Sequence, residues 1–281
     1  MAREALRGAL ADLEHGYVKR VAFVVPPSTS WSLPLYELAL MTAAEVHGMG
    51  MGDVQLTFVS TELSPMSMFG ATGGSEVAGL LREAGIEFVG SSYANLDGRR
   101  LILTPGNRVL EAERVVTLPM LLEPDLAGVP RDPDGFIPVD DHGRVDGVDD
   151  VYAAGDAITF PIKQGGLATQ QADAVAEAIA ARAGAPVAPA PFRPVLRGVL
   201  LTGGAKRYLR YALTGDEDEG AASEQALWRP PHKIAGRYLS PYLSGPGPDG
   251  QARREVRKTT AAGPPAGADP AQTVVEEQQE H

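Results

Sequence analysis

The stretch RVAFVVPPSTSWSLPLYELALMTAAEVHGMGMGDVQLTFVS, residues 20–60, decides the fold class. Residues 20–25 are apolar and rich in valine, a pattern that is typical of a buried strand. In residues 35–48 the apolar side chains recur at helical spacing, and Gly48 marks the expected end of this helix. Residues 53–60 predict a second strand. Two strands joined through a helix predict a parallel pair with a right-handed crossover.

The same alternation continues after residue 60. Residues 74–85 predict a second helix, with Ser75 as a candidate N-cap and Gly85 as a candidate C-cap. Residues 86–92 predict a third strand. The short apolar runs that follow, around the turns LDG and PGN, predict a small antiparallel excursion and a strand that returns to the sheet. We therefore expect an α/β fold with a Rossmann-like parallel sheet.

The composition excludes several classes of function. The net charge is −11 and the pI is about 5.0, whereas a nucleic-acid partner requires a basic surface. The sequence contains no cysteine, which excludes disulfides, thiolate metal sites and cysteine nucleophiles. The five histidines are scattered, so we expect no metal site. No run approaches the roughly 20 apolar residues of a membrane span, and a cytoplasmic location fits these features.

The sequence lacks a dinucleotide-binding fingerprint in the right place. One GxGxxG pattern exists, at Gly245, Gly247 and Gly250, but it lies in a polar, proline-containing tail and not between a strand and a helix. The first strand-to-helix turn contains no glycine and carries three prolines, each of which removes a backbone N–H donor. We therefore expect this domain to bind a nicotinamide cofactor poorly, which leaves the use of NAD(P) open.

Residues 151–180, VYAAGDAITFPIKQGGLATQQADAVAEAIA, predict a strand, a Gly-Asp turn, a glycine-rich loop and a helix over 167–183. Asp156 could accept hydrogen bonds from the ribityl hydroxyls of a flavin. The N–H groups of Gly166, Leu167 and Ala168, together with Lys163, could stabilise negative charge on reduced flavin. An ordinary turn, with Asp156 as a cap and Lys163 in solvent, is the alternative. The candidate flavin contacts are Ala154, Gly155, Asp156, Lys163, Gln164, Gly165, Gly166 and Leu167.

These residues carry a resemblance to a known family. VYAAGD, preceded by GFIPVDDHGRVDGVDD, resembles the second flavin-binding motif of the FAD-dependent pyridine nucleotide-disulfide oxidoreductase superfamily. KQGGLATQQA is similar to the segment that packs over the flavin in its sulfide:quinone oxidoreductase and type II NADH dehydrogenase branch. WSLPLYELA, with Glu37, resembles the middle domain of that branch. The resemblance implies FAD as the cofactor and hydride or electron transfer to a quinone-like or other small acceptor.

In that superfamily an N-terminal Rossmann unit with its own GxGxxG holds the adenine half of FAD, and no such unit is recognisable here. We expect the chain to be the C-terminal portion of such an enzyme, complemented by a separate FAD-binding chain if its gene is truncated or split. A non-catalytic subunit or remnant that pairs with such a chain is the alternative. A stand-alone NAD(P)-binding domain is a third reading, weakened by the prolines. Homo-oligomers are possible. The absence of cysteine makes sulfide oxidation unexpected.

The C-terminal part carries an aromatic and basic segment, residues 228–243, which could contact a membrane peripherally, mediate dimerisation or cover the flavin domain. Short hairpins are expected at residues 135–145 and within 194–215. The expected layout is an N-terminal helix (1–16), an NAD(P)-binding-like Rossmann domain (17–124), the C-terminal half of an FAD-binding domain (125–185), a short α+β C-terminal region (186–244) and a disordered tail (245–281).

Overall fold

The computed structural model describes residues 8, 11–27, 29–124, 126–214 and 220–239 of the 281-residue chain. The chain separates into residues 1–237 and 238–281, and every helix and strand described below lies in the first unit. Residues 8 and 11–14 are helical, in the region expected as an N-terminal helix. The tail expected to be disordered lies outside the described residues.

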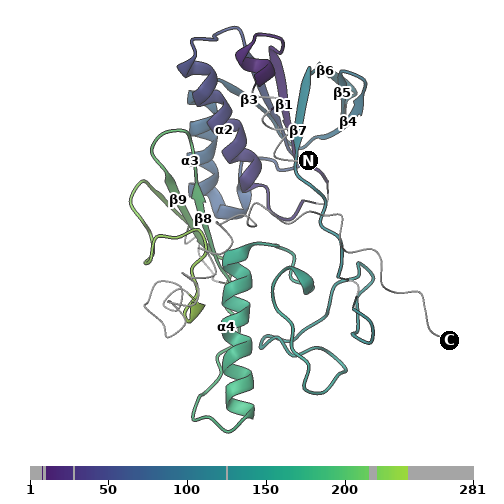
Figure 1. The fold of residues 1–281 in the computed structure, drawn as a ribbon, viewed down its shortest axis with the longest axis vertical. Helices are drawn as coiled ribbons and strands as arrows, with labels where there is room; N and C mark the ends of the chain where they lie inside the picture. Colours follow the sequence, from purple (N-terminus) through teal and green to yellow (C-terminus); the bar gives the residue numbers. More distant parts are fainter. Residues whose placement is uncertain (1–7, 9–10, 28, 125, 215–219, 240–281) are drawn as a thin grey trace, which may run out of the picture. The chain divides into compact units, whose positions relative to one another are not determined.

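A four-stranded parallel sheet confirms the expected strand–helix alternation (Figure 1). Its strands lie in the order β3-β2-β1-β7, and each neighbouring pair is parallel. The elements of this Rossmann-like part are β1 (Arg20–Val24), α2 (Leu33–Gly48), β2 (Gln55–Val59), the short 3-10 helix η1 (Ser67–Phe69), α3 (Gly70–Glu83), β3 (Ile86–Val89) and β7 (Arg114–Thr117).

The start of α3 differs from the expectation. α3 begins at Gly70, so Ser75 lies inside the helix and caps nothing. The reason is that η1 runs directly into α3 and supplies its first turn, which local sequence signals did not reveal. α2 ends at Gly48 as expected, and its C-cap is Met49. Gly85 does follow α3 as expected, and its N–H donates to the carbonyl of Arg82 at 3.1 Å.

The expected antiparallel excursion is a three-stranded sheet inserted before β7. It contains β4 (Tyr93–Asp97), β5 (Arg100–Thr104) and β6 (Arg108–Glu111). Leu101 and Leu103 of β5 are buried against Val24 and Val59, which lie on one face of the parallel sheet. The other face of the parallel sheet packs in the same buried cluster as α2 and α3. The parallel sheet is thus covered on both faces, as its apolar strands require.

A second antiparallel sheet confirms the hairpin expected within 194–215. It contains β8 (Val195–Leu200), β9 (Arg207–Ala212) and β10 (Ala221–Ser223), in the order β10-β9-β8. The free edge of β8 lies along α4 (Gly165–Arg182), where the Gln170 side chain amide donates to the Val195 carbonyl at 2.9 Å and its oxygen accepts from the Val195 N–H at 3.0 Å. α4 therefore protects an edge that would otherwise expose unpaired backbone groups.

The strand expected at the start of residues 151–180 does not form, so this prediction was wrong. Within the segment DVYAAG, Tyr152 alone pairs, in an isolated antiparallel bridge to Arg144, and residues Gly155–Ala157 form the short 3-10 helix η2. A strand requires a continuous hydrogen-bonded neighbour, and the described residues offer none along this segment. The expected hairpin at 135–145 is likewise reduced to one bridge, between Val139 and Val145.

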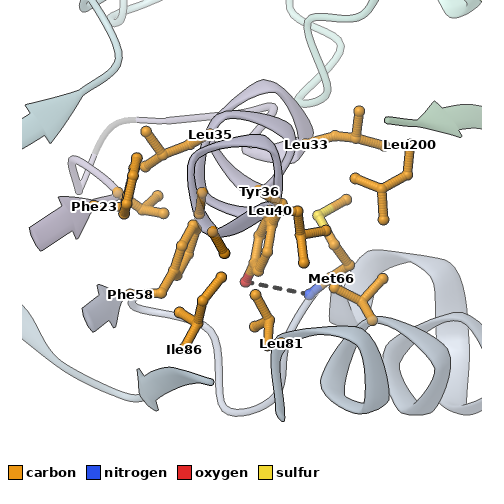
Figure 2. Close-up of a cluster of buried hydrophobic side chains, with 14 of the residues drawn as sticks. Phe23, Leu33, Leu35, Tyr36, Leu40, Phe58, Met66, Leu81, Ile86 and Leu200 are labelled. Atoms are coloured by element: carbon orange, nitrogen blue, oxygen red, sulfur yellow. Dashed lines mark hydrogen bonds between the residues drawn. The ribbon is translucent and has the colours of Figure 1, made fainter. Parts of the chain in front are cut away.

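Tyr36 on α2 anchors the main core (Figure 2). Its ring stacks on Phe58 of β2 with a centroid separation of 4.0 Å. Its hydroxyl donates to the Glu62 carboxylate at 2.8 Å and accepts from the Met66 N–H at 3.4 Å, the bond drawn in Figure 2. Burial, and then the Glu62 carboxylate, raise the pKa of the Tyr36 phenol far above its ordinary value. The phenol therefore stays protonated and holds the loop after β2 against α2.

We predict that Gly203→Ala destabilises the unit by about 1–3 kcal/mol. Gly203 has a φ of +80°, and a Cβ there would lie 2.3 Å from the Cβ of Ala44 on α2. The neighbouring Gly204→Ala is the matched control, because a Cβ at Gly204 meets only the Thr202 hydroxyl, at 3.8 Å. Thermal melting of both variants checks this, and equal melting temperatures would contradict the packing of the β8–β9 turn on α2.

We also predict that Tyr36→Phe costs about 1–3 kcal/mol of unfolding free energy, because it leaves the Glu62 carboxylate and the Met66 N–H without this hydroxyl. Tyr93→Phe is the control, since Tyr93 is half exposed. Urea unfolding gives both values. A Tyr36→Phe midpoint equal to that of the wild type would show that the hydroxyl contributes nothing to stability.

Candidate functional site

The turn at Gly155 is held against the start of α4. The Gly155 N–H donates to the side-chain oxygen of Gln171 at 2.8 Å. Gly155 has a φ of +81°, and a Cβ on it would lie 3.4 Å from the Cβ of Ala168. The positive φ favours glycine here, and the turn lies in van der Waals contact with the helix. The structure thus brings together the two segments that the sequence singled out, 154–156 and 163–168.

Asp156 lies exposed on this turn. Among the described residues, no hydrogen bond or ion pair occupies its carboxylate. The carboxylate lies close enough to Lys163 to raise the pKa of that ammonium, against a larger effect of burial. The alternative that Asp156 caps the helix is wrong, because the N-cap of α4 is Gln164. The carboxylate is available to accept hydrogen bonds from a ligand.

Gln164 organises the first turn of α4 and changes the expected set of free N–H groups. Its side-chain oxygen accepts from the Leu167 N–H at 2.8 Å, and its carbonyl accepts from the Ala168 N–H at 2.9 Å. Two of the three N–H groups expected to face a ligand are therefore used by the helix itself, since a helix end must satisfy its own donors. In the described part of the chain, the N–H groups of Gly165 and Gly166 make no hydrogen bond.

Gly166 also has a steric role in this cap. A Cβ at Gly166 would lie 2.9 Å from the side-chain oxygen of Gln164. The absence of a side chain at this position therefore lets Gln164 fold back over the helix. The Gln164 amide nitrogen, in turn, donates to the Arg197 carbonyl on β8 at 3.1 Å. One side chain thus joins the helix start to the neighbouring sheet.

Lys163 is buried and engaged, so the alternative of a solvated lysine is wrong. Its ammonium donates to the Ile158 carbonyl and lies 3.8 Å from the centroid of the Phe136 ring. Burial lowers the pKa of this ammonium, while Asp156 and Asp132 act in the opposite direction. Lys163 therefore closes the loop between η2 and α4, and any effect on a ligand would act through its positive charge.

The segment that we call the C-terminal strap, residues 228–237, packs back on the unit. The Lys233 ammonium pairs with the Glu37 carboxylate of α2 at 2.6 Å. The Arg237 guanidinium pairs with Glu177 of α4 at 2.5 Å. Two cations expected to contact a membrane are thus engaged by carboxylates of the same unit. Tyr242, the last aromatic residue of the expected membrane segment that the sequence highlighted, lies outside the described residues.

The strap also borders the glycine-rich start of α4. A Cβ at Gly165 would lie 3.1 Å from the end of the Ile234 side chain, and one at Gly236 would lie 2.0 Å from the Thr169 methyl group. Ile234 therefore forms one wall beside Gly165. The sequence alone did not reveal this neighbour, because about 70 residues separate the two positions.

The carboxyl edge of the parallel sheet, where a nicotinamide cofactor would bind, holds an internal network. Glu62 follows β2 and accepts hydrogen bonds from the hydroxyls of Tyr36 at 2.8 Å, Ser60 at 3.2 Å and Ser32 at 3.4 Å. Ser32 is the N-cap of α2 but makes no capping hydrogen bond with its side chain. Ser60 lies close to Glu62 in the sequence, but the Tyr36 and Ser32 hydroxyls come from the distant start of α2, so the sequence alone does not reveal this network.

A pocket of about 410 Å³ lies beside the Gly155 turn. Its lining includes Phe160, Phe192 and Ala174, with Asp140 and Asp141 among its polar residues. The rings of Phe160 and Phe192 meet edge to face at 5.3 Å. Elsewhere on this segment, the Tyr152 hydroxyl is buried and, among the described residues, has no hydrogen-bond partner. The aromatic rings make the pocket side of the turn largely apolar.

None of the helices in the described ranges combines the length and the apolar character that crossing a bilayer requires.

Comparison with known proteins relates this arrangement to a fold. The structure of the sulfide:quinone oxidoreductase from the hyperthermophilic bacterium Aquifex aeolicus is similar over 72% of this chain and 53% of that chain, with a TM-score of 0.63 and 18% sequence identity. A NAD-dependent persulfide reductase from A. fulgidus is similar over 72% of this chain and 38% of that chain, with a TM-score of 0.48 and 17% identity. No curated protein sequence matches the chain.

The chain spans about half the length of the sulfide:quinone oxidoreductase structure. The family model described as pyridine nucleotide-disulphide oxidoreductase matches residues 38–180, just over half of the 281 residues. This match includes most of α2, the Gly155 turn and most of α4. The chain therefore belongs to the pyridine nucleotide-disulphide oxidoreductase family.

Proposed function

We propose that residues 154–167 hold the isoalloxazine and ribityl half of FAD in a flavin-dependent oxidoreductase. Electrons or hydride would pass through the flavin to a quinone-like or other small acceptor. The observation that carries the proposal is the clamp between Gly155 and Gln171, which sets the exposed Asp156 carboxylate beside the first turn of α4. Membership of the family supports flavin-dependent chemistry in general. A cytoplasmic location is part of the proposal.

The residues present fit the flavin half of the cofactor. Asp156 would accept hydrogen bonds from the ribityl hydroxyls, and the backbone of Ala154 and Gly155 would line the chain. The N–H groups of Gly165 and Gly166 lie at the N-terminus of an 18-residue helix, where partial positive charge collects. They would face a carbonyl-bearing or anionic edge of the ring. The cofactor itself would supply the redox chemistry.

Lys163 and Leu167 have supporting roles in this proposal. The Leu167 N–H already bonds to Gln164, so Leu167 would contribute packing only. The Lys163 ammonium holds the Ile158 carbonyl and would favour electron acceptance by adding positive charge near the site. The network around Glu62 and the prolines before α2 give NAD(P) little to bind, so we propose a donor other than a nicotinamide cofactor bound there.

We further propose that the adenine half of FAD is held by a polypeptide segment outside these 281 residues, on a separate chain or elsewhere in a longer one. The largely apolar pocket lined by Phe160 and Phe192 supports a docking partner on that side of the Gly155 turn. If that partner supplies all the redox chemistry, the chain is a non-catalytic subunit, which is the second candidate function. Homo-oligomerisation remains a prediction.

Binding of riboflavin and FAD to the chain tests this function. Because only the shared flavin half would be contacted, we expect the two dissociation constants to agree within about threefold. Asp156→Ala should weaken both by about tenfold or more, since it removes charged hydrogen bonds. Asp149→Ala is the control, because Asp149 is exposed and lies on another turn. Flavin fluorescence quenching gives the constants.

Two results would contradict the half-site. FAD that binds more than about tenfold tighter than riboflavin would mean that the chain holds the adenine half itself. Equal affinities of the wild type and Asp156→Ala would remove Asp156 from the site.

A second prediction concerns Lys163. Lys163→Met removes a positive charge next to the site, so the reduction potential of bound flavin should become more negative. Lys206→Met is the control, because Lys206 is exposed on the β8–β9 turn. Spectroelectrochemistry measures the potentials, and circular dichroism checks that both variants fold. An unchanged potential in a folded Lys163→Met protein would limit Lys163 to closing the loop.

A further inference from the structure

The outer face of the β8–β9 hairpin carries two arginines side by side. Arg197 on β8 and Arg210 on β9 are directly opposite each other in the antiparallel register. The next pair, Gly198 and Leu209, is buried on the inner face. Directly opposed residues of an antiparallel pair point to the same face with their Cβ atoms about 5 Å apart. The two arginine side chains therefore extend from the same face of the sheet, next to each other.

No carboxylate in the described part of the chain pairs with either guanidinium. The contrast with Arg207 is direct, because that residue pairs with Glu76 at 2.6 Å and with Glu224 at 2.9 Å. The Arg197 Nε atom is buried and has no hydrogen-bond partner among the described residues. Burial, and then the charge of Arg210, lower the pKa of Arg197. Like charges opposed across a strand pair destabilise a sheet, so a negative charge beside the two guanidinium groups would be stabilising.

Neighbouring groups give the pair a defined setting. The Arg197 carbonyl accepts the hydrogen bond from Gln164, so the strand at this point is fixed to the first turn of α4. Tyr208 lies two residues before Arg210 on the same face of β9, and its ring meets Trp228 edge to face at 5.3 Å. An aromatic wall thus stands beside the two charges. An arginine pair with one buried, unsatisfied donor has the chemistry of an oxyanion site.

We propose that Arg197 and Arg210 bind a small oxyanion, a phosphate, sulfate or carboxylate group. Two guanidinium forks can each donate two N–H groups to such an anion, which also cancels their repulsion. The site is separate from the proposed flavin contacts and stands without them. It would take the acidic group of a ligand or substrate next to the start of α4.

Titration of the full chain with inorganic phosphate by calorimetry tests this site, with chloride at equal ionic strength as the reference. We expect saturable phosphate binding that weakens at least tenfold in Arg197→Gln and in Arg210→Gln. Arg193→Gln is the matched control, because Arg193 is exposed just before β8, and its affinity should stay within twofold of the wild type. Without phosphate, Arg210→Gln should melt no lower than the wild type, because it removes a repulsion.

Three outcomes would overturn the proposal. One is no saturable phosphate binding by the folded wild type. Another is equal affinity in the wild type and Arg210→Gln. The third concerns the acidic connection between β9 and β10, which contains Asp216, Glu217, Asp218 and Glu219. If phosphate binds only after these four residues are neutralised to their amides, the chain's own carboxylates are the occupant and no external anion is bound.

Discussion

The hydrogen bond between the Gly155 N–H and Gln171 is the contact on which the candidate site depends. This hydrogen bond joins the Gly155 turn, which belongs to no β-sheet, to α4, which other contacts hold in place. The anchor is provided by two more glutamines of the same region, Gln164 and Gln170, which bond to the free edge of β8. β8 in turn packs on α2. Three neutral side chains thus connect the Asp156 turn to the main core, in addition to the buried Lys163 ammonium, which closes the loop between η2 and α4.

The Rossmann-like part of the chain retains its fold but has an unusual ligand edge. The parallel sheet, its two covering helices and the crossover connections are all present. At the carboxyl edge, however, prolines stand where a fingerprint needs backbone donors, and Glu62 is bonded to hydroxyls of the protein. Tyr36 makes the same network part of the core. The Glu62 carboxylate is therefore used in hydrogen bonds that stabilise the core, and it is not free to bind a ligand.

Local sequence signals predicted the helices and strands well, because the spacing of apolar residues reflects which face of each element is buried. They identified β1, α2, β2 and the excursion before β7. They also singled out residues 154–156 and 163–168, which the structure brings together, since the glycine pattern there reflects close backbone approach. They failed where partners are distant in sequence. The capping role of Gln164, the burial of Lys163 under Phe136 and the contact of Ile234 with Gly165 all depend on tertiary packing.

The segment 150–155 shows the same limit in another way. Its composition is that of a buried strand, yet it pairs only through Tyr152, because strand formation depends on a neighbour as well as on residue type. The Arg197–Arg210 pair was not recognised either, since two arginines 13 residues apart meet only through the hairpin register.

Amide chemical-shift mapping with riboflavin tests the central claim most directly. If the Gly155 turn and the start of α4 form the flavin half-site, the shifts that saturate with riboflavin will cluster at residues 155–157 and 165–166. Shifts centred on the loop before α2 and on Glu62, with residues 155–166 unaffected, would place the ligand at the carboxyl edge of the parallel sheet and contradict the account.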